Sequence, residues 1–326
     1  MVDGGLPVAA SGEGASVVVY ENVLPGITVG QSSHTRFRTD FVLLEGLEAV
    51  RAVLEVGVVA SSRRVGGFRI GFGRVTLTRE FKPQVCSSFG EKIFCKFVYD
   101  VTPVIRSTHS NSFKVEVEDY SIESIVVEQV GFLVEYSYPG AATKYCLCSG
   151  ALTLAPREAY RLSLGSIFAS PELRFVGFVP HTEAVVTVNG SRIPGNGFVE
   201  HSIVARGSLG AVTVAHESDG SYFPRHALAS SILVVESQVP MPALAIGEAY
   251  RSEGRIMVKI RNTGSIGASN VIVVALSKGM VVDRKVVERV EAGSEKLVEL
   301  KAEESVTVRV IWRHVGRTFF REVKVK

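Results

Sequence analysis

The last part of the chain begins Pro240-Met241-Pro242-Ala243-Leu244 and continues with Val258-Lys259-Ile260-Arg261-Asn262-Thr263-Gly264. Short segments that alternate between apolar and polar residues follow, at residues 270–276 and 304–312. Alternation with period two is typical of a β-strand with one buried face. Proline cannot donate a hydrogen bond to a strand ladder, so residues 239–242 separate this stretch from what precedes it. We therefore predict that residues 239–326 form a small β-sandwich with its own boundaries.

The same alternation recurs through the rest of the chain, and helical periodicity is nearly absent. Predicted strands lie at residues 16–20, 49–56, 67–77, 112–117, 173–179, 184–188, 211–216 and 231–236. Only residues 45–54 can also be interpreted as a helical turn. The spacing of these segments is typical of sandwiches and jelly rolls. The predicted fold class is therefore all-β: two jelly-roll-like β-sandwiches followed by an immunoglobulin-like β-sandwich.

Turn residues suggest where these domains begin and end. Pro139-Gly140 lies in a candidate link at residues 136–142, and the small residues of 1–14 predict a flexible N-terminal arm. The expected domains are the arm at 1–14, a first sandwich at 15–139, a second at 140–238 and the immunoglobulin-like domain at 239–326.

The dipeptide Asn189-Gly190 is a strong hairpin signal, because both residues tolerate the positive φ of a type I′ turn. The sequence Asn189-Gly190-Ser191 is also an N-x-S sequon, so Asn189 is a glycosylation candidate if the protein is exported.

Composition excludes some classes of function and favours others. The 326 residues include 36 basic and 33 acidic side chains, a net charge of +3, which is too balanced to indicate nucleic-acid binding. The sequence contains no apolar run long enough to span a membrane. Only six Asn and four Gln occur, a scarcity found in heat-adapted proteins. The N-terminus lacks the basic and apolar segments of a signal peptide, so the protein is either cytosolic or exported with its leader already removed. We expect the second.

Four cysteines are candidates for disulfide bonds: Cys86, Cys95, Cys146 and Cys148. Cys86 and Cys95 flank a short loop and could close a hairpin. Cys146 and Cys148 share one face of a strand, so we expect them to reach across to Cys86 and Cys95, or to stay reduced. Three connectivities remain open. A Cys₄ zinc site is disfavoured, because neither spacing matches a C-x₂-C knuckle.

No other arrangement of residues predicts catalysis. The loop His216-Glu217-Ser218-Asp219 holds three metal-ligand types, but a solvated hairpin explains it as well. Glu116 and Glu118 lie two apart on one strand face and are expected to point to solvent. We therefore predict no catalytic residue, no cofactor and no metal.

Several short motifs carry a resemblance to a known family. They are Asp100-Val101-Thr102-Pro103 after a strand, Gly131-Phe132-Leu133-Val134-Glu135-Tyr136, the segment 145–150, and Asp219-Gly220-Ser221-Tyr222-Phe223-Pro224 leading to a closing strand at 231–236. In this order they resemble the DUF3344 domain of secreted and surface proteins, mainly archaeal, and residues 239–326 are similar to a cell-adhesion-related (CARDB-like) immunoglobulin-like domain. The resemblance implies an extracellular location and supplies no catalytic residues.

These observations predict a non-enzymatic extracellular structural or adhesive protein of a cell surface, such as a subunit of a surface layer or filament. Expected partners are further copies of the chain, other surface proteins and glycans. The arm at 1–14 and the strand after it could pair with the sheet edge of a neighbouring copy. The alternative is a secreted carbohydrate-binding module or a jelly-roll hydrolase, which would rest on analogy of fold alone.

Overall fold

The structure, a computed structural model, describes residues 3–30, 35–61, 67–78, 83–108, 110–120, 123–205, 207–219, 225–302 and 305–325. Antiparallel strands make up nearly all of the regular structure in these ranges, which confirms the all-β prediction. The chain divides into unit 1, residues Met1–Gln238, and unit 2, residues Val239–Lys326. None of the described helices has the length and apolar character needed to cross a membrane.

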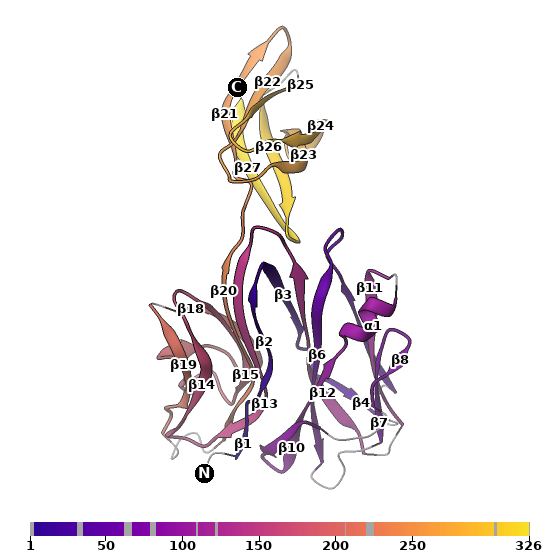
Figure 1. Cartoon of the computed structure of the whole chain (residues 1–326), viewed down its shortest axis with the longest axis vertical. Coiled ribbons are helices and arrows are strands. Elements are labelled where there is room, and N and C mark those ends of the chain that lie inside the picture. Colours follow the sequence, from indigo (N-terminus) through magenta and orange to yellow (C-terminus); the bar gives the residue numbers. More distant parts are fainter. Residues whose placement is uncertain are drawn as a thin grey trace. The chain divides into compact units, whose positions relative to one another are not determined.

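The first sandwich of unit 1 consists of two sheets (Figure 1). Its inner sheet has the strand order β3-β12-β6-β10-β9, with β4 beside β12, and its outer sheet has the order β5-β11-β7-β8. These strands are β3 (Ser16–Val23), β4 (Ile27–Val29), β5 (Arg36–Val42), β6 (Ala49–Ser61), β7 (Phe68–Phe72), β8 (Val75–Thr76), β9 (Val85–Phe89), β10 (Lys92–Asp100), β11 (Ser112–Asp119) and β12 (Ile125–Ser137).

The second sandwich repeats this plan. Its inner sheet has the order β13-β20-β15-β18 and its outer sheet has the order β14-β19-β16-β17. These strands are β13 (Ala142–Leu154), β14 (Glu158–Phe168), β15 (Glu172–Val179), β16 (Val186–Val188), β17 (Ser191–Ile193), β18 (Gly197–Val204), β19 (Leu209–His216) and β20 (Ala227–Gln238).

Both sandwiches have jelly-roll topology. In each, eight strands taken in chain order form one sheet of the first, eighth, third and sixth strands and a second sheet of the second, seventh, fourth and fifth. This interleaving is the double-sheet arrangement of a jelly roll. In the first sandwich the eight strands are β3, β5, β6, β7, β8, β10, β11 and β12, while β4 and β9 are additions. We call the two sandwiches jelly roll 1 and jelly roll 2.

The prediction of a flexible arm at residues 1–14 is wrong for the described part, residues 3–14. These residues form β1 (Asp3–Gly5) and β2 (Val8–Gly14), which pair with β13 at the edge of jelly roll 2. Leu6 is buried in the core of that jelly roll, and this burial holds the segment in place although its residues are small. The next strand, β3, belongs to jelly roll 1, so the N-terminus links the two sandwiches.

Other local predictions have mixed outcomes. Asn189 and Gly190 have φ values of 48° and 74° and join β16 to β17, as the type I′ turn requires. The predicted link at Pro139-Gly140 is a turn between β12 and β13. The alternative of a helical turn at 45–54 is wrong, because most of this segment is the beginning of β6. The helix α1 (Thr102–Ser107) was not predicted, although Pro103 suits its first turn.

Unit 2 is a sandwich of seven strands with immunoglobulin-like connectivity. One sheet has the order β21-β22-β25 and the other has the order β24-β23-β26-β27. Its strands are β21 (Leu244–Ser252), β22 (Arg255–Asn262), β23 (Ala268–Ser277), β24 (Met280–Val290), β25 (Glu295–Lys301), β26 (Val306–His314) and β27 (Arg317–Val325). Trp312 is buried in its core and stacks on Phe319, so its position is structural.

The two inner sheets of unit 1 pack against each other, and we call this contact the inner interface (Figure 1). In β6, alternate residues face opposite sides: Leu54, Val56 and Val58 enter the core of jelly roll 1, whereas Val53 and Val59 enter the inner interface. In β13, Cys146 and Cys148 enter the core of jelly roll 2, while the residue between them, Leu147, enters the inner interface. These strands are buried on both faces, which explains why their apolar runs are nearly continuous.

We predict that deleting residues 1–14 destabilises unit 1. The deletion removes the strands that cover the edge of β13, and with them the buried Leu6. The loss of such a leucine alone costs about 2–5 kcal/mol of unfolding free energy. Calorimetry of the full chain, with a chain that starts at residue 3 as the control, measures the effect. An unfolding transition of unit 1 that stays unchanged would contradict the structural role of β1 and β2.

Candidate functional site

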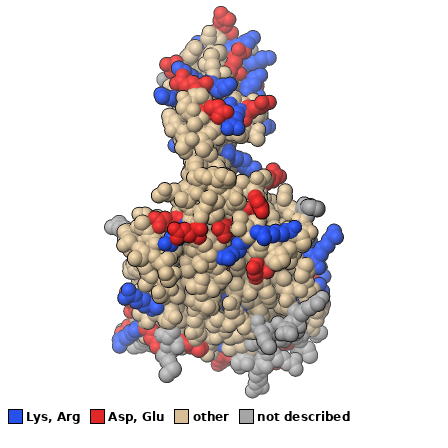
Figure 2. Space-filling view, in the orientation of Figure 1, with Lys and Arg blue, Asp and Glu red and all other residues tan. Residues whose placement is uncertain are grey.

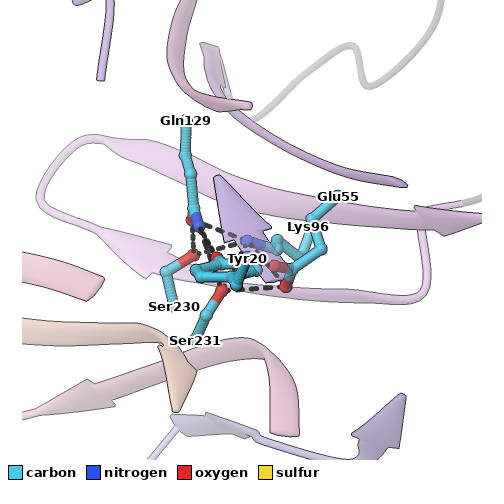
Figure 3. Close-up of polar contacts among 6 residues, drawn as sticks. All are labelled: Tyr20, Glu55, Lys96, Gln129, Ser230 and Ser231. Carbon is cyan, nitrogen blue, oxygen red and sulfur yellow. Dashed lines mark hydrogen bonds and ion pairs between the residues drawn. The ribbon is translucent and has the colours of Figure 1, made fainter. Parts of the chain in front are cut away.

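Six polar side chains meet at the centre of the inner interface, and we call them the polar bridge: Tyr20, Glu55, Lys96, Gln129, Ser230 and Ser231 (Figure 3). Lys96, Glu55, Gln129 and Ser230 have an exposed fraction of 0%. Four members belong to jelly roll 1 and the two serines belong to β20 of jelly roll 2. The polar bridge therefore joins the two sandwiches through buried contacts.

The alternation of side chains along a strand explains why three members of the polar bridge face the inner interface. Glu55 lies between Leu54 and Val56, which face the core of jelly roll 1, so the Glu55 side chain faces the interface. Lys96 lies in the same way between Cys95 and Phe97 of β10. Tyr20 of β3 packs in the apolar cluster of the interface.

Two β-bulges bring in the remaining members. The pairing of β12 with β6 shifts between Val127 and Gln129, so Glu128 is the extra residue, and Gln129 turns from the core side to the interface. The pairing of β20 with β15 shifts in the same way around Ser230. Because a bulge disrupts the alternation, the consecutive residues Ser230 and Ser231 both reach Lys96.

The Lys96 amine is surrounded by acceptors. Its Nζ donates to Gln129 Oε1 at 2.6 Å and to the Oγ atoms of Ser230 and Ser231 at 3.0 Å each. It lies 3.4 Å from Glu55 Oε1, which makes a fully buried ion pair. An ammonium has no lone pair, so the Gln129 atom that faces it is the oxygen.

The carboxylate of Glu55 accepts hydrogen bonds from both jelly rolls. The Tyr20 hydroxyl donates to Oε2 at 2.8 Å, and Ser231 Oγ donates to Oε1 at 2.8 Å. Gln129 Nε2 donates to Ser231 Oγ at 3.1 Å and to the Tyr20 hydroxyl at 3.3 Å, and Ser230 Oγ donates to Gln129 Oε1 at 2.5 Å. The hydrogen bonds thus form closed circuits in which each member has partners, as a buried network requires.

Burial shifts the protonation of two members. It lowers the pKa of Lys96 to about 8, while the charge of Glu55 acts in the opposite direction. Burial, together with the charge of Glu55, raises the pKa of Tyr20 well above its ordinary value of 10.0. The phenol therefore remains a donor at neutral pH, and the amine has a larger neutral fraction than an exposed lysine.

Two glycines leave room for the polar bridge. Gly57 is the residue of β6 that lies opposite both Lys96 and Gln129, and a Cβ there would come within 2.6 Å of the Phe94 ring and 3.3 Å of Gln129 Cβ. A Cβ on Gly131 would lie 2.7 Å from Glu55 Oε2. A side chain at Gly131 would displace Glu55, and one at Gly57 would press on Phe94 and Gln129.

Apolar and ionic contacts enclose the polar bridge. On one side, Phe94 stacks on Phe198 with ring centroids 5.5 Å apart, and Phe89 meets Phe178 edge to face at 4.8 Å. On another side, Arg174 donates to the backbone oxygen of Tyr20 at 2.6 Å and pairs with Glu200. All of these contacts cross from one jelly roll to the other except the Arg174–Glu200 ion pair, which lies within jelly roll 2.

The cysteines do not form part of this site. Cys86 and Cys95 face each other on β9 and β10 and form a disulfide, one of the predicted pairings. Cys146 and Cys148 are free and buried, with Sγ atoms 3.7 Å apart. Of the two predicted alternatives, staying reduced is confirmed. Reaching Cys86 and Cys95 is wrong, because Cys146 and Cys148 point into the core of jelly roll 2 whereas Cys95 lies in the core of jelly roll 1.

The side chains of residues 216–219 that could bind a metal ion do not come together at one point. His216 is buried, with Nδ1 3.4 Å from the oxygen of Leu154, and burial lowers its pKa. Glu217 accepts from Thr187, Ser218 accepts from the backbone of Val185, and Asp219 pairs with Arg157. The part of the motif at residues 220–224 lies outside the described residues.

The other candidates also have structural contacts. Glu116 and Glu118 both pair with Arg36, and Glu116 also pairs with Lys114. The hydrogen bond from Lys114 lowers the pKa of Glu116. Asn189 is exposed and its side chain accepts from the backbone of Thr213 at 2.8 Å, so it remains a glycosylation candidate.

The polar bridge is not among the sites predicted from the sequence. A usable signal exists in Leu54-Glu55-Val56 and Cys95-Lys96-Phe97, where opposite charges interrupt apolar runs of similar length. Buried charges are normally paired, so two such interruptions predict a mutual contact. The serines and Gln129 carry no comparable signal.

No family model and no curated protein matches this chain. Solved structures of a β-glucuronidase from Ruminococcus gnavus are among the structural matches, at low similarity. The complex with D-glucuronic acid is 13% identical and the match covers 54% of this chain and 36% of the enzyme, with a TM-score of 0.21. The complex with an N1-substituted uronic isofagomine is 12% identical over 54% and 37% of the two chains, with the same TM-score. The match thus spans little more than a third of the enzyme, and a TM-score this low carries no argument about function.

We predict that Gly131→Ala weakens unit 1 by about 1–3 kcal/mol, the usual cost of adding a methyl group to a filled site. The new Cβ would meet Glu55 Oε2 at 2.7 Å and the Tyr20 hydroxyl at 2.8 Å. Gly14→Ala is the matched control, because nothing lies within 4 Å of its Cβ, and we expect a change below about 0.5 kcal/mol. Urea denaturation measures both. If both substitutions changed the free energy of unfolding equally, the polar bridge would have room for a methyl group at residue 131, which would contradict the prediction.

We also predict that acid weakens unit 1 through His216. The pKa of this buried imidazole lies below its ordinary value of 6.5, so the unfolded chain takes up a proton first as the pH falls through about 6.5. The free energy of unfolding then decreases, and His216→Gln reduces this slope. His181→Gln, at an exposed position, leaves His216 in place and keeps the slope. The slope is measured by denaturation at several pH values between 5 and 8, the range in which an ordinary histidine titrates. The same slope in His216→Gln and in the wild type would contradict the prediction.

Proposed function

We propose that the chain is a non-enzymatic structural or adhesive protein that works outside the cell by holding partners together. The observation that carries this proposal is the polar bridge, because it joins two jelly rolls into one body. Sliding one sandwich over the other would separate the pair Lys96–Glu55 from the serines of β20 and leave both buried charges short of hydrogen bonds. Each buried group left unsatisfied costs about 1–3 kcal/mol. A body that resists deformation suits a protein that bears load.

The disulfide supports an oxidising location. Cys86–Cys95 joins neighbouring strands of jelly roll 1. Disulfides persist mainly in exported proteins, because cytosolic reductants keep thiols free. This agrees with the resemblance to surface proteins with a cell-adhesion-related domain, and we include a cell-surface location in the proposal.

Unit 2 offers a surface for self-association. Among the described residues, β24 forms a ladder only with β23, so the backbone groups of its other edge pair with no strand. Beside β24, the backbone N–H of Lys301 in β25 donates to the Asp283 carboxylate. The strand exposes Met280, Val281, Val282 and Val286, with exposed fractions of 70%, 59%, 49% and 54%. An open edge with exposed apolar side chains is a template for a further strand. Unit 2 carries charges of both signs on the face seen in Figure 2. Its ion pairs include Lys259–Glu295.

The charges of β24 favour a second copy of β24 as the added strand. If two copies pair antiparallel with Val286 opposite itself, Arg284 of each copy lies opposite Glu288 of the other. Asp283 then lies opposite Arg289. The same patch meets itself across a twofold axis, as in most homodimers. The pairing lies beyond the bulge at Val282, where the ladder of β24 is regular.

We predict that Arg284→Glu weakens self-association and that adding Glu288→Arg restores it. The single change places like charges opposite each other twice, at a cost of about 1–2 kcal/mol, or about tenfold in dissociation constant. The double change inverts each pair and recovers complementarity. Sedimentation equilibrium of the wild type, the single and the double variant measures the constants. A wild type that stays monomeric at all accessible concentrations would contradict this mode of assembly, as would a folded double variant that fails to recover association.

A further inference from the structure

In the polar bridge, the primary amine of Lys96 lies in direct contact with the primary amide of Gln129. The ion pair of Lys96 with Glu55 does not require this contact. Lys96 Nζ lies 2.6 Å from Gln129 Oε1, next to the carbon to which that oxygen is bonded (Figure 3). The two residues are on β10 and β12, either side of Gly57 in β6, so no side chain of β6 separates them. Reactive groups fixed in contact react as if at very high concentration.

The surroundings of Lys96 prepare the amine as a nucleophile. Burial brings its pKa to about 8, so a neutral fraction exists at neutral pH. Glu55 lies 3.4 Å away and can accept the proton that the amine must lose. A base within reach of a weakly acidic nucleophile is the usual arrangement for activating it.

The surroundings of Gln129 prepare the amide for attack. Its carbonyl oxygen accepts from Ser230 Oγ at 2.5 Å in addition to Lys96. A donor aimed at this oxygen stabilises the negative charge that develops there when a nucleophile adds to the carbon. The bulge in β20 is what places Ser230 in this position.

The nitrogen that leaves, Nε2 of Gln129, can receive the proton that it needs through hydrogen-bonded hydroxyls. Gln129 Nε2 donates to the Tyr20 hydroxyl and to Ser231 Oγ, and both hydroxyls donate in turn to Glu55. A proton that Glu55 takes from the amine can therefore return through either hydroxyl to Nε2. Burial of the whole network keeps bulk water from competing with the amine for the carbonyl carbon.

We propose that Lys96 and Gln129 condense spontaneously into an intramolecular amide cross-link. The neutral Nζ of Lys96 attacks Cδ of Gln129, and a C–N bond forms. The oxyanion on Oε1 is held by the Ser230 hydroxyl. Glu55 passes a proton through Tyr20 or Ser231 to Nε2, the old C–N bond breaks and ammonia leaves.

The reaction balances without an added reagent. The lysine ammonium and the glutamine carboxamide give a secondary amide and one ammonium ion, and the Glu55 carboxylate is restored. No electron is transferred. The product removes a positive charge from the buried site and joins β10 to β12 across β6. Because the disulfide joins β9 to β10, the inner sheet of jelly roll 1 would be linked covalently from β9 to β12.

Mass spectrometry of the reduced and denatured full chain tests the cross-link. We expect an intact mass lower than the sequence mass by one ammonia. Trypsin should fail to cut after Lys96, and the peptide 93–106 should be recovered joined to the peptide 115–144. An intact mass equal to the sequence mass, with separate peptides cut after Lys96, would overturn the proposal.

Variants locate the chemistry. Asn189-Gly190 could also lose ammonia by closing on itself, so Gln129→Met is needed: it should show no joined peptides and restore cleavage after Lys96. Glu55→Gln should also leave the peptides separate. Glu135→Gln, which alters the contact of Glu135 with Tyr145 beside the interface, is the matched control and should keep the cross-link. Joined peptides in Gln129→Met would overturn the assignment to this residue, and joined peptides in Glu55→Gln would overturn the role given to Glu55.

Discussion

A buried amine and a buried carboxylate have to be satisfied by protein groups, and this constraint shapes unit 1. Lys96 and Glu55 both have an exposed fraction of 0%. Their remaining hydrogen bonds come from Tyr20 and Gln129 in jelly roll 1 and from Ser230 and Ser231 in jelly roll 2. Removing jelly roll 2 would therefore leave the two charged groups of jelly roll 1 with unmet hydrogen bonds in an apolar surface. The pair fixes the position of one jelly roll on the other.

The shared topology of the two jelly rolls provides the geometry for this contact. In each, the eighth strand carries a bulge where it pairs with the third: at Glu128 in β12 and at Ser230 in β20. Each bulge turns polar residues out of an apolar face and toward the opposite inner sheet. The N-terminal strands β1 and β2 add a second link, because they complete a sheet of jelly roll 2 while the next strand enters jelly roll 1. Residues 3–238 therefore act as one body made of two similar halves.

The sequence predicts the architecture better than the site. Alternating apolar residues and turn signals such as Asn189-Gly190 are local, so the strands, the hairpin and the link at Pro139-Gly140 could be anticipated. The N-terminal strand β2 could not, because its small residues have weak strand preference and are held by pairing with the distant β13. The bulges at Glu128 and Ser230 also leave no local signal. Without them, alternation places Gln129 on the wrong face, so the polar bridge could not be assembled from the sequence.

The most direct measurement of the central claim is native-state hydrogen exchange resolved by residue across unit 1. If the polar bridge joins the jelly rolls into one body, slowly exchanging amides of β6 and β12 and those of β15 and β20 open with the same free energy, since neither half unfolds alone. If the two sets of amides instead opened with different free energies, one jelly roll would open while the other stays protected. That result would show that the halves are independent and that the buried pair does not unite them.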